Sequence, residues 1–573
     1  MKDLTTGGEA RALFAFSVPM LLGNVFQQFY NMVDSVVVGN FVGKTALAAV
    51  GASFPILMLM VSVQIGLTMG ATVLIAQQFG AGERDRIRTT VNTTYIAIFW
   101  SSAVLSIVGV LATPFILRAM HIPDDVLPEA SAYLRILFAG MLGPFGYNTV
   151  SAVLRGLGDS RTPLYALIFS TVVNIVLDLV FVAVFHWGVA GVAWATVIAQ
   201  TASFLAALAF LDKRNPYVRF SFHGLSFDRP TFDLSMKIGL PSGLQQGLVA
   251  FGHMILMRLV NGFGTDAVAG FSAASRLDSF AMMPAMSLSQ AVTTFTGQNI
   301  GAGRVDRVRN GLRAGLRVSL AISGVIGLAV ILSSGDLISL FNQDPGVVSV
   351  GERYLLVIGM SYSLFGILFL MNGVFRGAGE AMIPMYSTIL ALWLVRVPCA
   401  VWFSSRMGVD GIWWSVPAGW TVGCVFTGLY YASGRWKRKS LVGMSGSGSG
   451  PGMEGEDMDR MISYCGLVCS ECPALVARRT GDDDLRRRTA AEWSAMHGAD
   501  VRPEHVDCDG CTAAGGIHTP HCFECGIRAC GIGRQVANCG RCDEYPGCRK
   551  ISDFLAMVPD ARKVLDAERN GSV

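Results

Sequence analysis

Eleven cysteines near the end of the chain are the residues whose spacing points most directly to chemistry. They are Cys465, Cys469, Cys472, Cys508, Cys511, Cys522, Cys525, Cys530, Cys539, Cys542 and Cys548. Four Cys-x2-Cys pairs are among them, and such pairs are typical ligands of structural zinc. With His518 and His521 nearby, the set can fill two tetrahedral sites and offers ligands toward a third. The spacing therefore predicts a small domain stabilised by metal.

Other interpretations of this domain are less favoured. An iron–sulfur cluster is the alternative to zinc, because sites with four sulfur ligands suit both. Disulfides are disfavoured because cytoplasmic thiols stay reduced. From Met461 onward there are 14 Lys and Arg against 16 Asp and Glu, whereas a nucleic-acid-binding domain would need a basic face. The chain shows no Ser/His/Asp constellation and no GxxxxGK[ST] loop, so neither an enzyme nor an ATP-driven pump is expected.

A second set of polar side chains lies inside long apolar segments of the first half of the chain. Three predicted helices each carry such residues at helical spacing on one face. The three sets are Asn24, Gln27, Asn31 and Asp34; Thr171, Asn174 and Asp178; and Thr196 and Gln200. Facing lipid would leave these groups without hydrogen-bond partners. We therefore expect the three polar faces to turn toward one another.

This shared face can bind a cation in two ways. Asp34, Asn174, Asp178 and Thr196 offer the oxygen ligands that a hard cation such as sodium prefers. The two aspartates can instead hold a proton, because two carboxylates in a dry site cannot both ionise cheaply. The structural alternative is that the asparagine and the threonine only hydrogen-bond neighbouring helices. Two buried aspartates favour the functional interpretation.

The elements that position these side chains must lie in a membrane. Of the 573 residues, 52% are hydrophobic and only 15% are charged, whereas an ordinary globular protein carries about 25% charged residues. A spanning helix needs about 20 mostly apolar residues. Twelve segments qualify: 12–38, 50–79, 91–113, 130–154, 164–186, 189–212, 234–260, 268–297, 312–333, 352–375, 384–404 and 409–432. The expected fold class is an all-α integral membrane protein with twelve transmembrane helices.

Lysines and arginines in the short loops indicate the orientation. The loops 80–88, 155–161, 211–219, 301–309 and 434–440 are basic, and they alternate with neutral or acidic loops. Basic loops remain in the cytoplasm. Both termini and the cysteine-rich domain are therefore expected on the cytoplasmic side of a multi-pass protein, with the lipid bilayer of the cell membrane around its helices.

The membrane part is a duplication. The motifs that start at Gly80, Arg155 and Pro163 recur 221 positions later; the two copies read Gly80-Ala81-Gly82 and Gly301-Ala302-Gly303, Arg155-Gly156-Leu157-Gly158 and Arg376-Gly377-Ala378-Gly379, and Pro163 and Pro384. With six spans each, both copies enter the membrane in the same direction. We expect two repeated six-helix bundles, residues 1–220 and 221–440, that flank a cleft. A cleft that opens alternately to either side is typical of a transporter.

Five stretches of this part resemble the multidrug and toxic compound extrusion (MATE) family over residues 10–435. They are the paired FGAGERDRIR and IGAGRVDRVR, the paired RGLGDSRTP and RGAGEAMIP, and the opening SVPMLLGNVFQQFYNMVDSVVVG. The resemblance implies an antiporter that exports amphipathic, often cationic compounds in exchange for sodium ions or protons. It also implies a cation site in the first lobe at the positions of Asp34, Asn174, Asp178 and Thr196.

The second half lacks carboxylates that some members of this family carry on the seventh and tenth helices. The stretches 244–257 and 361–371 contain none, which disfavours coupling through the second lobe, although Asp278, His253 and Arg396 lie at membrane depth. Polar amides and flexible thioethers suit a cleft that accepts many shapes. The candidates for its lining are Gln27, Asn31, Gln245, Gln246, Met257, Met282 and Met286.

The remaining organisation follows from composition. The Gly/Ser-rich stretch 441–460 predicts a flexible linker to the domain 461–573, whose CGLVCSEC and CDGC stretches resemble a bacterial cysteine-rich family regarded as zinc-binding. The function expected is multidrug efflux by a monomeric, cation-coupled antiporter. Two alternatives remain open: a flippase of lipid-linked precursors, and a transporter gated by a metal- or redox-sensing tail.

Overall fold

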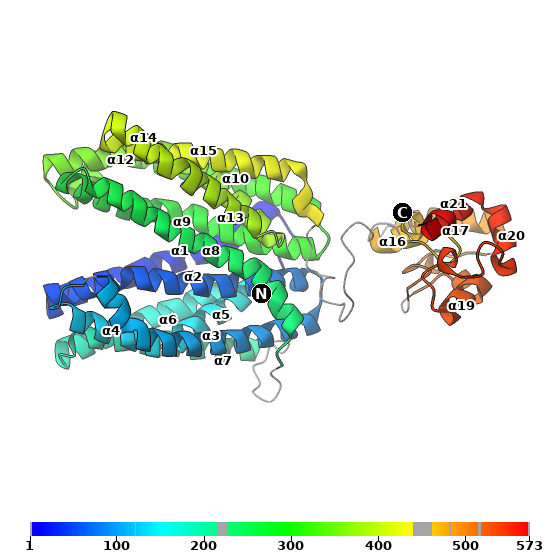
Figure 1. Ribbon diagram of the computed structural model, residues 1–573, viewed down its shortest axis with the longest axis horizontal. Coiled ribbons are helices and arrows are strands. Elements are labelled where there is room, and N and C mark those ends of the chain that lie inside the picture. Colours follow the sequence, from blue (N-terminus) through cyan, green and yellow to red (C-terminus); the bar gives the residue numbers. More distant parts are fainter. Residues whose placement is uncertain are drawn as a thin grey trace. The chain divides into compact units, whose positions relative to one another are not determined.

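The computed structural model describes residues 3–120, 122–214, 226–438, 461–480, 483–498, 500–513 and 517–570. The chain divides into two compact units, Met1–Gly448 and Ser449–Val573. The first is a bundle of long helices and the second is a small helical domain (Figure 1). The predicted linker 441–460 lies outside the described residues, as does most of the predicted basic loop 211–219.

The first half of the large unit contains six helical rods, three of which are bent or extended by a second element. They are α1 (Glu9–Val37) with π-helical η1 (Val38–Val42), α2 (Lys44–Gly80), α3 (Arg84–Ala119), α4 (Leu127–Ala139) with α5 (Leu142–Gly156), α6 (Arg161–Asp178) with π-helical η2 (Leu179–Val184), and α7 (Gly188–Arg214). The predicted fourth span is therefore broken, and its two parts meet at an angle of 48°.

The second half repeats this order. Its rods are α8 (Arg229–Asn261), α9 (Thr265–Gly301), α10 (Val305–Leu332) followed by the short α11 (Ser334–Ser339), α12 (Pro345–Gly377), α13 (Met382–Thr388) continued by π-helical η5 (Ile389–Arg396) and α14 (Val397–Met407), and α15 (Val409–Ser433), which ends in the 3₁₀ turn η6 (Arg435–Arg438). In Figure 1 the second half lies above the first, and the halves meet through α1 and α2 of the first and α8 and α9 of the second.

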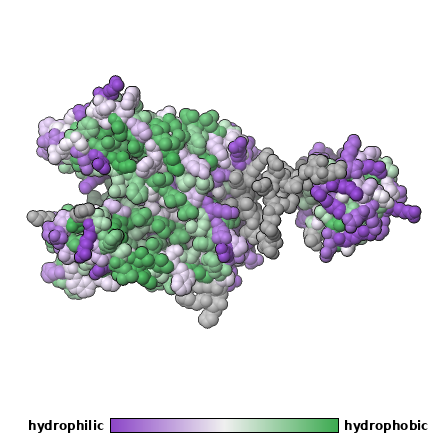
Figure 2. All heavy atoms as spheres, viewed as in Figure 1, coloured by the Kyte–Doolittle hydropathy of each residue, from purple (hydrophilic) through white to green (hydrophobic). Residues whose placement is uncertain are grey.

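The large unit has the apolar surface of a membrane protein. Among the described residues, eight helical segments are long and apolar enough to cross a membrane, and the bent pair α4–α5 makes a ninth. Helices α8, α9 and α15 lie outside this set and complete the twelve rods. Figure 2 shows hydrophobic side chains across the middle of this unit and hydrophilic ones toward its ends. The predicted all-α membrane fold with two repeated bundles is confirmed.

The repeat is visible in the backbone. Helices α2 and α9 both contain 37 residues. Each ends in a Gly-Ala-Gly turn whose last glycine has a positive φ, 74° at Gly82 and 71° at Gly303. Side chains are rarely tolerated in this conformation, so the same turn geometry explains why both copies carry glycine there.

Two matching hydrogen bonds join the halves at the end that the basic loops predict to be cytoplasmic. The side-chain amide of Gln77 on α2 donates to the Gly377 carbonyl at 2.9 Å, and that of Gln298 on α9 donates to the Gly156 carbonyl at 3.0 Å. Both the two glutamines and the two glycines are 221 positions apart. The repeat has therefore built one contact twice, in opposite directions across the interface.

Helices α2 and α9 also touch through their backbones at this joint. A Cβ atom at Gly80 would lie 1.9 Å from the Gln298 carbonyl oxygen, and one at Gly301 would lie 1.9 Å from that of Gln77. Such an approach excludes any side chain. The Gly80 and Gly301 positions of the repeated motif thus serve interlobe packing as well as the turn that follows.

The N-terminal segment covers the same joint. The backbone N–H of Leu4 donates to Oε1 of Gln298 at 3.0 Å, and the side chain of Asn299 donates to the Leu4 carbonyl at 3.2 Å. Arg304 donates to the Thr5 carbonyl at 2.8 Å. Leu4 is buried. Residues before the first helix are therefore bound to the second half of the unit.

The small unit is built from short helices around two small apolar clusters. Its elements are η8 (Cys469–Glu471), α16 (Pro473–Thr480), α17 (Asp483–His497), η9 (Pro503–His505), α18 (Pro520–Glu524), α19 (Gly526–Gly533), η10 (Cys539–Arg541), α20 (Arg549–Met557) and α21 (Pro559–Asn570). One cluster surrounds Leu565 and Tyr545, and the other surrounds Ala474 and Val506. A core this small needs an additional source of stability, such as a structural metal ion.

Candidate cation site and metal centre

The three predicted polar faces of the first half do meet, and two acids lie at the contact. Asn174 and Asp178 on α6 are fully buried, and Asp34 on α1 is half-buried. With its nitrogen turned toward the acids, the Asn174 amide donates to Oδ1 of Asp34 at 2.9 Å and to Oδ2 of Asp178 at 3.3 Å. The carboxyl groups themselves lie close enough to share a hydrogen bond when one is protonated. One amide thus holds two acids from two helices together.

Thr196 on α7 joins this group through a residue that the sequence analysis did not single out. The hydroxyl of Tyr30, one turn before Asp34 on α1, lies 3.1 Å from Oγ1 of Thr196. Tyr30 is buried, and both Tyr30 and Tyr133 lie near the two acids. A tyrosine four residues from an aspartate on one helix was the signal available in the sequence.

The other members of the polar stripes have different roles. Asn24 donates across to the Ser287 hydroxyl on α9 at 3.0 Å, so it faces the second half. Thr171 donates to the Leu167 carbonyl of its own helix at 2.9 Å. Oε1 of Gln200 is buried and has no hydrogen-bond partner among the described residues. The stripe on α1 therefore divides between the two halves along its length.

Both acids lie next to π-helical backbone. Asp178 is the last residue of α6 and directly precedes η2, and Asp34 lies four residues before η1. Single turns of π-helix are rare and occur frequently at functional sites. This local change from α-helix was not expected from the sequence, because apolar periodicity does not distinguish the two helix types over one turn.

The predicted cleft residues lie in varied surroundings. Gln245 is buried, and its amide contacts the Pro384 carbonyl, Thr388 and Arg376 at 3.1, 2.8 and 3.0 Å. It therefore fastens α8 to α12 and α13. Gln27, Gln246, Met257 and Met282 are half-buried, whereas Asn31 and Met286 are exposed. Their role in binding a transported compound stays a prediction.

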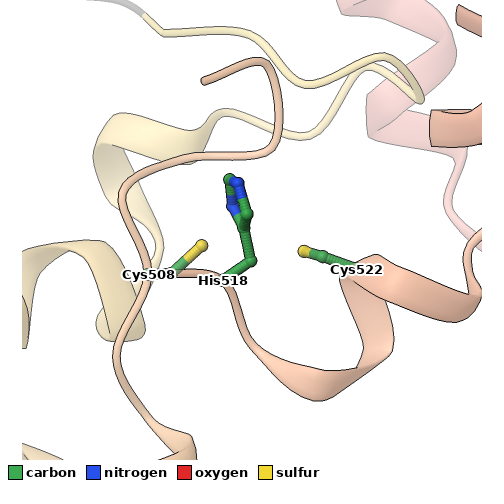
Figure 3. A group of neighbouring side chains, drawn as sticks. All are labelled: Cys508, His518 and Cys522. Atoms are coloured by element: carbon green, nitrogen blue, oxygen red, sulfur yellow. The ribbon is translucent and has the colours of Figure 1, made fainter. Parts of the chain in front are cut away.

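Three side chains of the small unit form a group suited to a metal ion. The ligand atoms of Cys508, His518 and Cys522 lie within 4.8 Å of one another. Figure 3 shows the two sulfur atoms on either side of the histidine. Nδ1 of His518 is buried and has no hydrogen-bond partner among the described residues. Two thiols and an imidazole are a donor set that fits zinc. Of the two histidines, the exposed His521 takes no part.

Charged neighbours hold this group in place. Asp507 and Asp509 flank Cys508, and Arg478 on α16 contacts them at 3.6 and 2.5 Å. Arg486 on α17 contacts Asp507 at 2.8 Å. Arg528 on α19 donates to the Cys511 carbonyl at 2.9 Å and lies 3.1 Å from Nε2 of His518. Helices α16, α17 and α19 therefore fix the loop that carries Cys508 and Cys511.

Other cysteines lie around this group and around a second one. Cys469 lies near Cys508 and Cys472, and burial raises the pKa of its thiol to about 11. Burial also raises the pKa of the Cys511 thiol to about 12. A separate small pocket is lined by Cys530, Cys539, Cys542 and Cys548. The cysteines that these contacts place thus form two neighbourhoods, and Cys465 lies near members of both.

Comparison with known proteins identifies the membrane unit. The MatE family pattern matches residues 19–180 and 241–402, one stretch in each half. The chain belongs to the MatE family. The probable multidrug resistance protein YpnP of Bacillus subtilis is 34% identical over 442 residues, which cover 77% of this chain and 98% of YpnP. The probable multidrug resistance protein NorM of Thermotoga maritima is 27% identical over 75% of this chain and 94% of its own length.

Solved structures agree with this MatE assignment. The outward-facing conformation of a multidrug resistance MATE family transporter is 25% identical, with a TM-score of 0.71 over 76% of this chain and 98% of that one. A crystal structure of MATE in complex with MaL6 has a TM-score of 0.72 at 24% identity over 75% of this chain and 97% of that one, which shows the shared fold. Residues 461–553 match a protein family of unknown function, DUF3795.

Proposed function

We propose that this MatE-family chain exports amphipathic or cationic small molecules across the cytoplasmic membrane in exchange for a cation, with Asp34, Asn174, Asp178 and Thr196 as the coupling site. The observation that carries the proposal is the pair of acids from α1 and α6 held by one amide. Acids inside a membrane protein are costly and mark ion or proton pathways. Helices from different parts of one half meet there, so occupancy can alter their packing.

The cation is a sodium ion or a proton, and each corresponds to one orientation of the Asn174 amide. Two carboxyl groups side by side in a low-dielectric site cannot both be ionised. With its nitrogen turned toward both acids, Asn174 suits a pair that shares one proton. A sodium ion would need the amide oxygen turned inward to complete a set of oxygen ligands.

Alternating access in this proposal uses the joint between the halves. The paired bonds of Gln77 and Gln298 close the end that carries the basic loops. The surface in Figure 2 is indented between the halves at the opposite end, near α4 and α14. Export requires the closed joint to open toward the cytoplasm, admit the compound and close again. Relatives named as multidrug resistance proteins support the direction and class of transport.

The proposal is tested by transport in proteoliposomes with sodium and proton gradients imposed separately. Asp34→Asn preserves the side-chain shape and removes the charge. We expect it to lower gradient-driven export strongly, whereas Asp85→Asn, at an exposed position in the first turn of α3, should leave export unchanged. Normal export by Asp34→Asn under both gradients would contradict the coupling assignment.

For the small unit we propose a metal-stabilised domain, with zinc favoured over an iron–sulfur cluster and with Cys508, His518 and Cys522 as ligands of one ion. This proposal rests on two observations. The ligand atoms of the three residues lie within 4.8 Å of one another, and the buried Nδ1 of His518 has no hydrogen-bond partner among the described residues. Metal bound at such a site contributes folding free energy directly. Whether the domain gates transport is a separate question.

Elemental analysis of the purified full-length chain tests this second proposal. We expect zinc in excess of that found in a chain truncated after Met444, and loss of part of it in His518→Ala. His521→Ala, which alters an exposed neighbour, is the matched control and should retain the metal. Equal metal content in the full-length and truncated chains would rule the site out. Visible absorbance together with equimolar iron and sulfide would show that the domain holds an iron–sulfur cluster and not zinc. Unchanged transport and regulation in the truncated chain would remove a sensing role.

A further inference from the structure

One buried acid in the second half has no role in the proposed coupling site. Asp278 lies on α9, 13 residues after the helix begins, which is about 20 Å along it at a rise of 1.5 Å per residue. Its side chain is only 9% exposed. The hydroxyl of Tyr354 on α12, itself 4% exposed, donates to Oδ2 of Asp278 at 3.0 Å. The carboxyl group is therefore held inside the helix bundle.

Several polar atoms around this carboxyl lack hydrogen-bond partners. Oδ1 of Asp278 and the hydroxyl of Tyr362 are buried without a partner among the described residues, as are Nε of Arg396 and Nε1 of Trp413. Tyr362 nevertheless lies close enough to Asp278 for a side-chain hydrogen bond, Arg396 acts on the carboxyl through its charge, and the Trp413 ring contacts that of Tyr354. An unpaired buried polar group costs about 1–3 kcal/mol. A proton on Oδ1 would let the carboxyl donate to the Tyr362 oxygen and satisfy both atoms.

The aromatic rings around this acid pack closely against one another. Phe271 and Trp413 stack with ring centroids 5.3 Å apart. Tyr354 lies edge-on to both, at 5.5 and 4.9 Å. Trp413 is 1% exposed. A transported drug cannot enter this packed cluster without displacing it.

The charges around Asp278 decide between a metal ion and a proton. The groups that act on it are Tyr354 and Tyr362 from α12 and Arg396 from η5. No ion pair within 4 Å joins Arg396 to Asp278 in the part of the chain that the structure describes. His253 on α8 lies near Arg396, and Arg276 on α9 is two residues from Asp278 and faces elsewhere.

A hard cation does not suit this environment. It requires about six oxygen ligands, whereas three oxygen-bearing side chains converge here beside a guanidinium. A proton needs one acceptor atom and no cavity. A buried carboxyl without a charged partner in contact also becomes neutral rather than remaining ionised.

The internal repeat gives an independent reason to compare this acid with those of the first half. Tyr354 lies 221 positions after Tyr133, and Tyr133 lies near Asp34 and Asp178. Equivalent tyrosines on the fourth rod of each half thus face buried acids, although the acids come from non-equivalent positions. Both groups also lie next to π-helical backbone, because Arg396 is the last residue of η5 and Asp178 directly precedes η2.

We propose that Asp278 is a proton-binding site of this transporter, located in the second half and formed with Tyr354 and Arg396. In the protonated state the proton resides on Oδ1. On release the O–H bond breaks and the proton passes to water. The carboxylate that remains is stabilised by the hydrogen bond from Tyr354 and by the charge of Arg396. This site is additional to the proposed coupling pair of the first half and does not depend on it.

Infrared difference spectroscopy of the full-length protein in lipid tests this site, with spectra recorded between acidic and alkaline pH. We expect Asp278→Asn to remove one band of a protonated carboxyl group that disappears on alkalinisation. Tyr354→Phe should shift that same band, because the carboxyl loses a hydrogen bond, and should change the pH at which it disappears. Asp278→Glu should retain a titrating band at a displaced frequency, and it serves as the readout if Asp278→Asn does not fold.

Comparison with Asp34→Asn separates this inference from the proposed function. Asp34→Asn should leave the Asp278 band in place, whatever it does to transport. If Asp278→Asn folds and every carboxyl band of the wild type survives, Asp278 does not exchange a proton and the proposal is overturned. The band that is missing from the Asp278→Asn spectrum should be the one that Tyr354→Phe shifts. If Tyr354→Phe leaves that band in place, the assignment of the band to the Asp278–Tyr354 pair is wrong. Failure of Asp34→Asn to affect export would overturn the coupling proposal alone.

Discussion

The two halves of the membrane unit share a backbone plan and differ in how they hold buried acids. In the first half Asp34 and Asp178 come from two helices and are bridged by Asn174. In the second half Asp278 stands alone among tyrosines, with Arg396 nearby. The position equivalent to Asn174 is Val395 and the one equivalent to Asp178 is Cys399. The duplicated fold therefore repeats its helix contacts without repeating its polar chemistry.

This difference teaches which features a duplication must keep. The Gln77 and Gln298 bonds recur because each half presents the same glycine carbonyl to the other. A polar group inside the bundle is constrained only by its own neighbours, so each half can place its acid on a different helix. Mutations can test whether the two halves share their helix packing and differ in the chemistry of their buried acids.

The largest effect is expected from Asp34→Asn. Removing the charge from the bridged pair should lower cation-driven export by about 100-fold, near the upper range of coupling between two binding sites. The measurement is initial export rate at saturating gradient in proteoliposomes. A folded Asp34→Asn protein with an export rate within twofold of wild type would contradict the coupling role of the first half.

A smaller loss is expected from Asp178→Asn. Asn174 can still donate to Asp34 in this variant, so part of the site remains, and we expect export to fall by about 10-fold. The same assay applies, with Asn174→Ala as the companion variant. If Asp178→Asn lost more than Asp34→Asn, the primary acid would be the one on α6.

The interlobe joint should weaken when either of its glutamines is removed. Gln77→Ala and Gln298→Ala each remove a buried hydrogen bond and leave a carbonyl unpaired, at a cost of about 1–3 kcal/mol. We expect increased hydrogen exchange of segments 76–84 and 296–304 in both variants, and Gln298→Ala should also loosen the N-terminal segment because it removes the acceptor of the Leu4 N–H. Gln64→Ala removes a 3.0 Å bond to the Pro144 carbonyl within the first half and is the matched control. Unchanged exchange of these segments in either joint variant would contradict the role of its bond in the joint.

The smallest effect on coupling is expected in the second half. Alanine at Gln245, Gln246 or His253 should leave the dependence of export on the cation gradient unchanged, because none of these positions supplies a carboxylate. Affinity for the exported compound can fall, and Gln245→Ala should also lower stability because its amide has three partners. Loss of cation dependence here, with Asp34→Asn retaining it, would reverse the assignment of the halves.

Much of the fold follows from local sequence. Long apolar segments predict helices and their number, since a membrane leaves the backbone no other hydrogen-bond partners. Loops and repeats follow from glycine and basic residues at fixed offsets. The sequence also predicted that Asp34, Asn174 and Asp178 share a face. It did not predict the break between α4 and α5 or the π-helical turns, because these depend on packing against neighbouring helices.

The membrane class, the duplication, the three polar stripes and the cysteine-rich character of residues 461–573 follow from the sequence alone, since these rest on composition and on helical periodicity. Which members of each stripe meet depends on the tertiary packing. In the structure Asn24 contacts Ser287, Asp34 contacts Asn174, and Tyr30 joins the group through Thr196. His518, and not His521, lies beside Cys508 and Cys522. The physical reason is that spacing fixes the direction of a side chain relative to its own helix. Its partners are fixed only when other helices, distant in sequence, pack against that face.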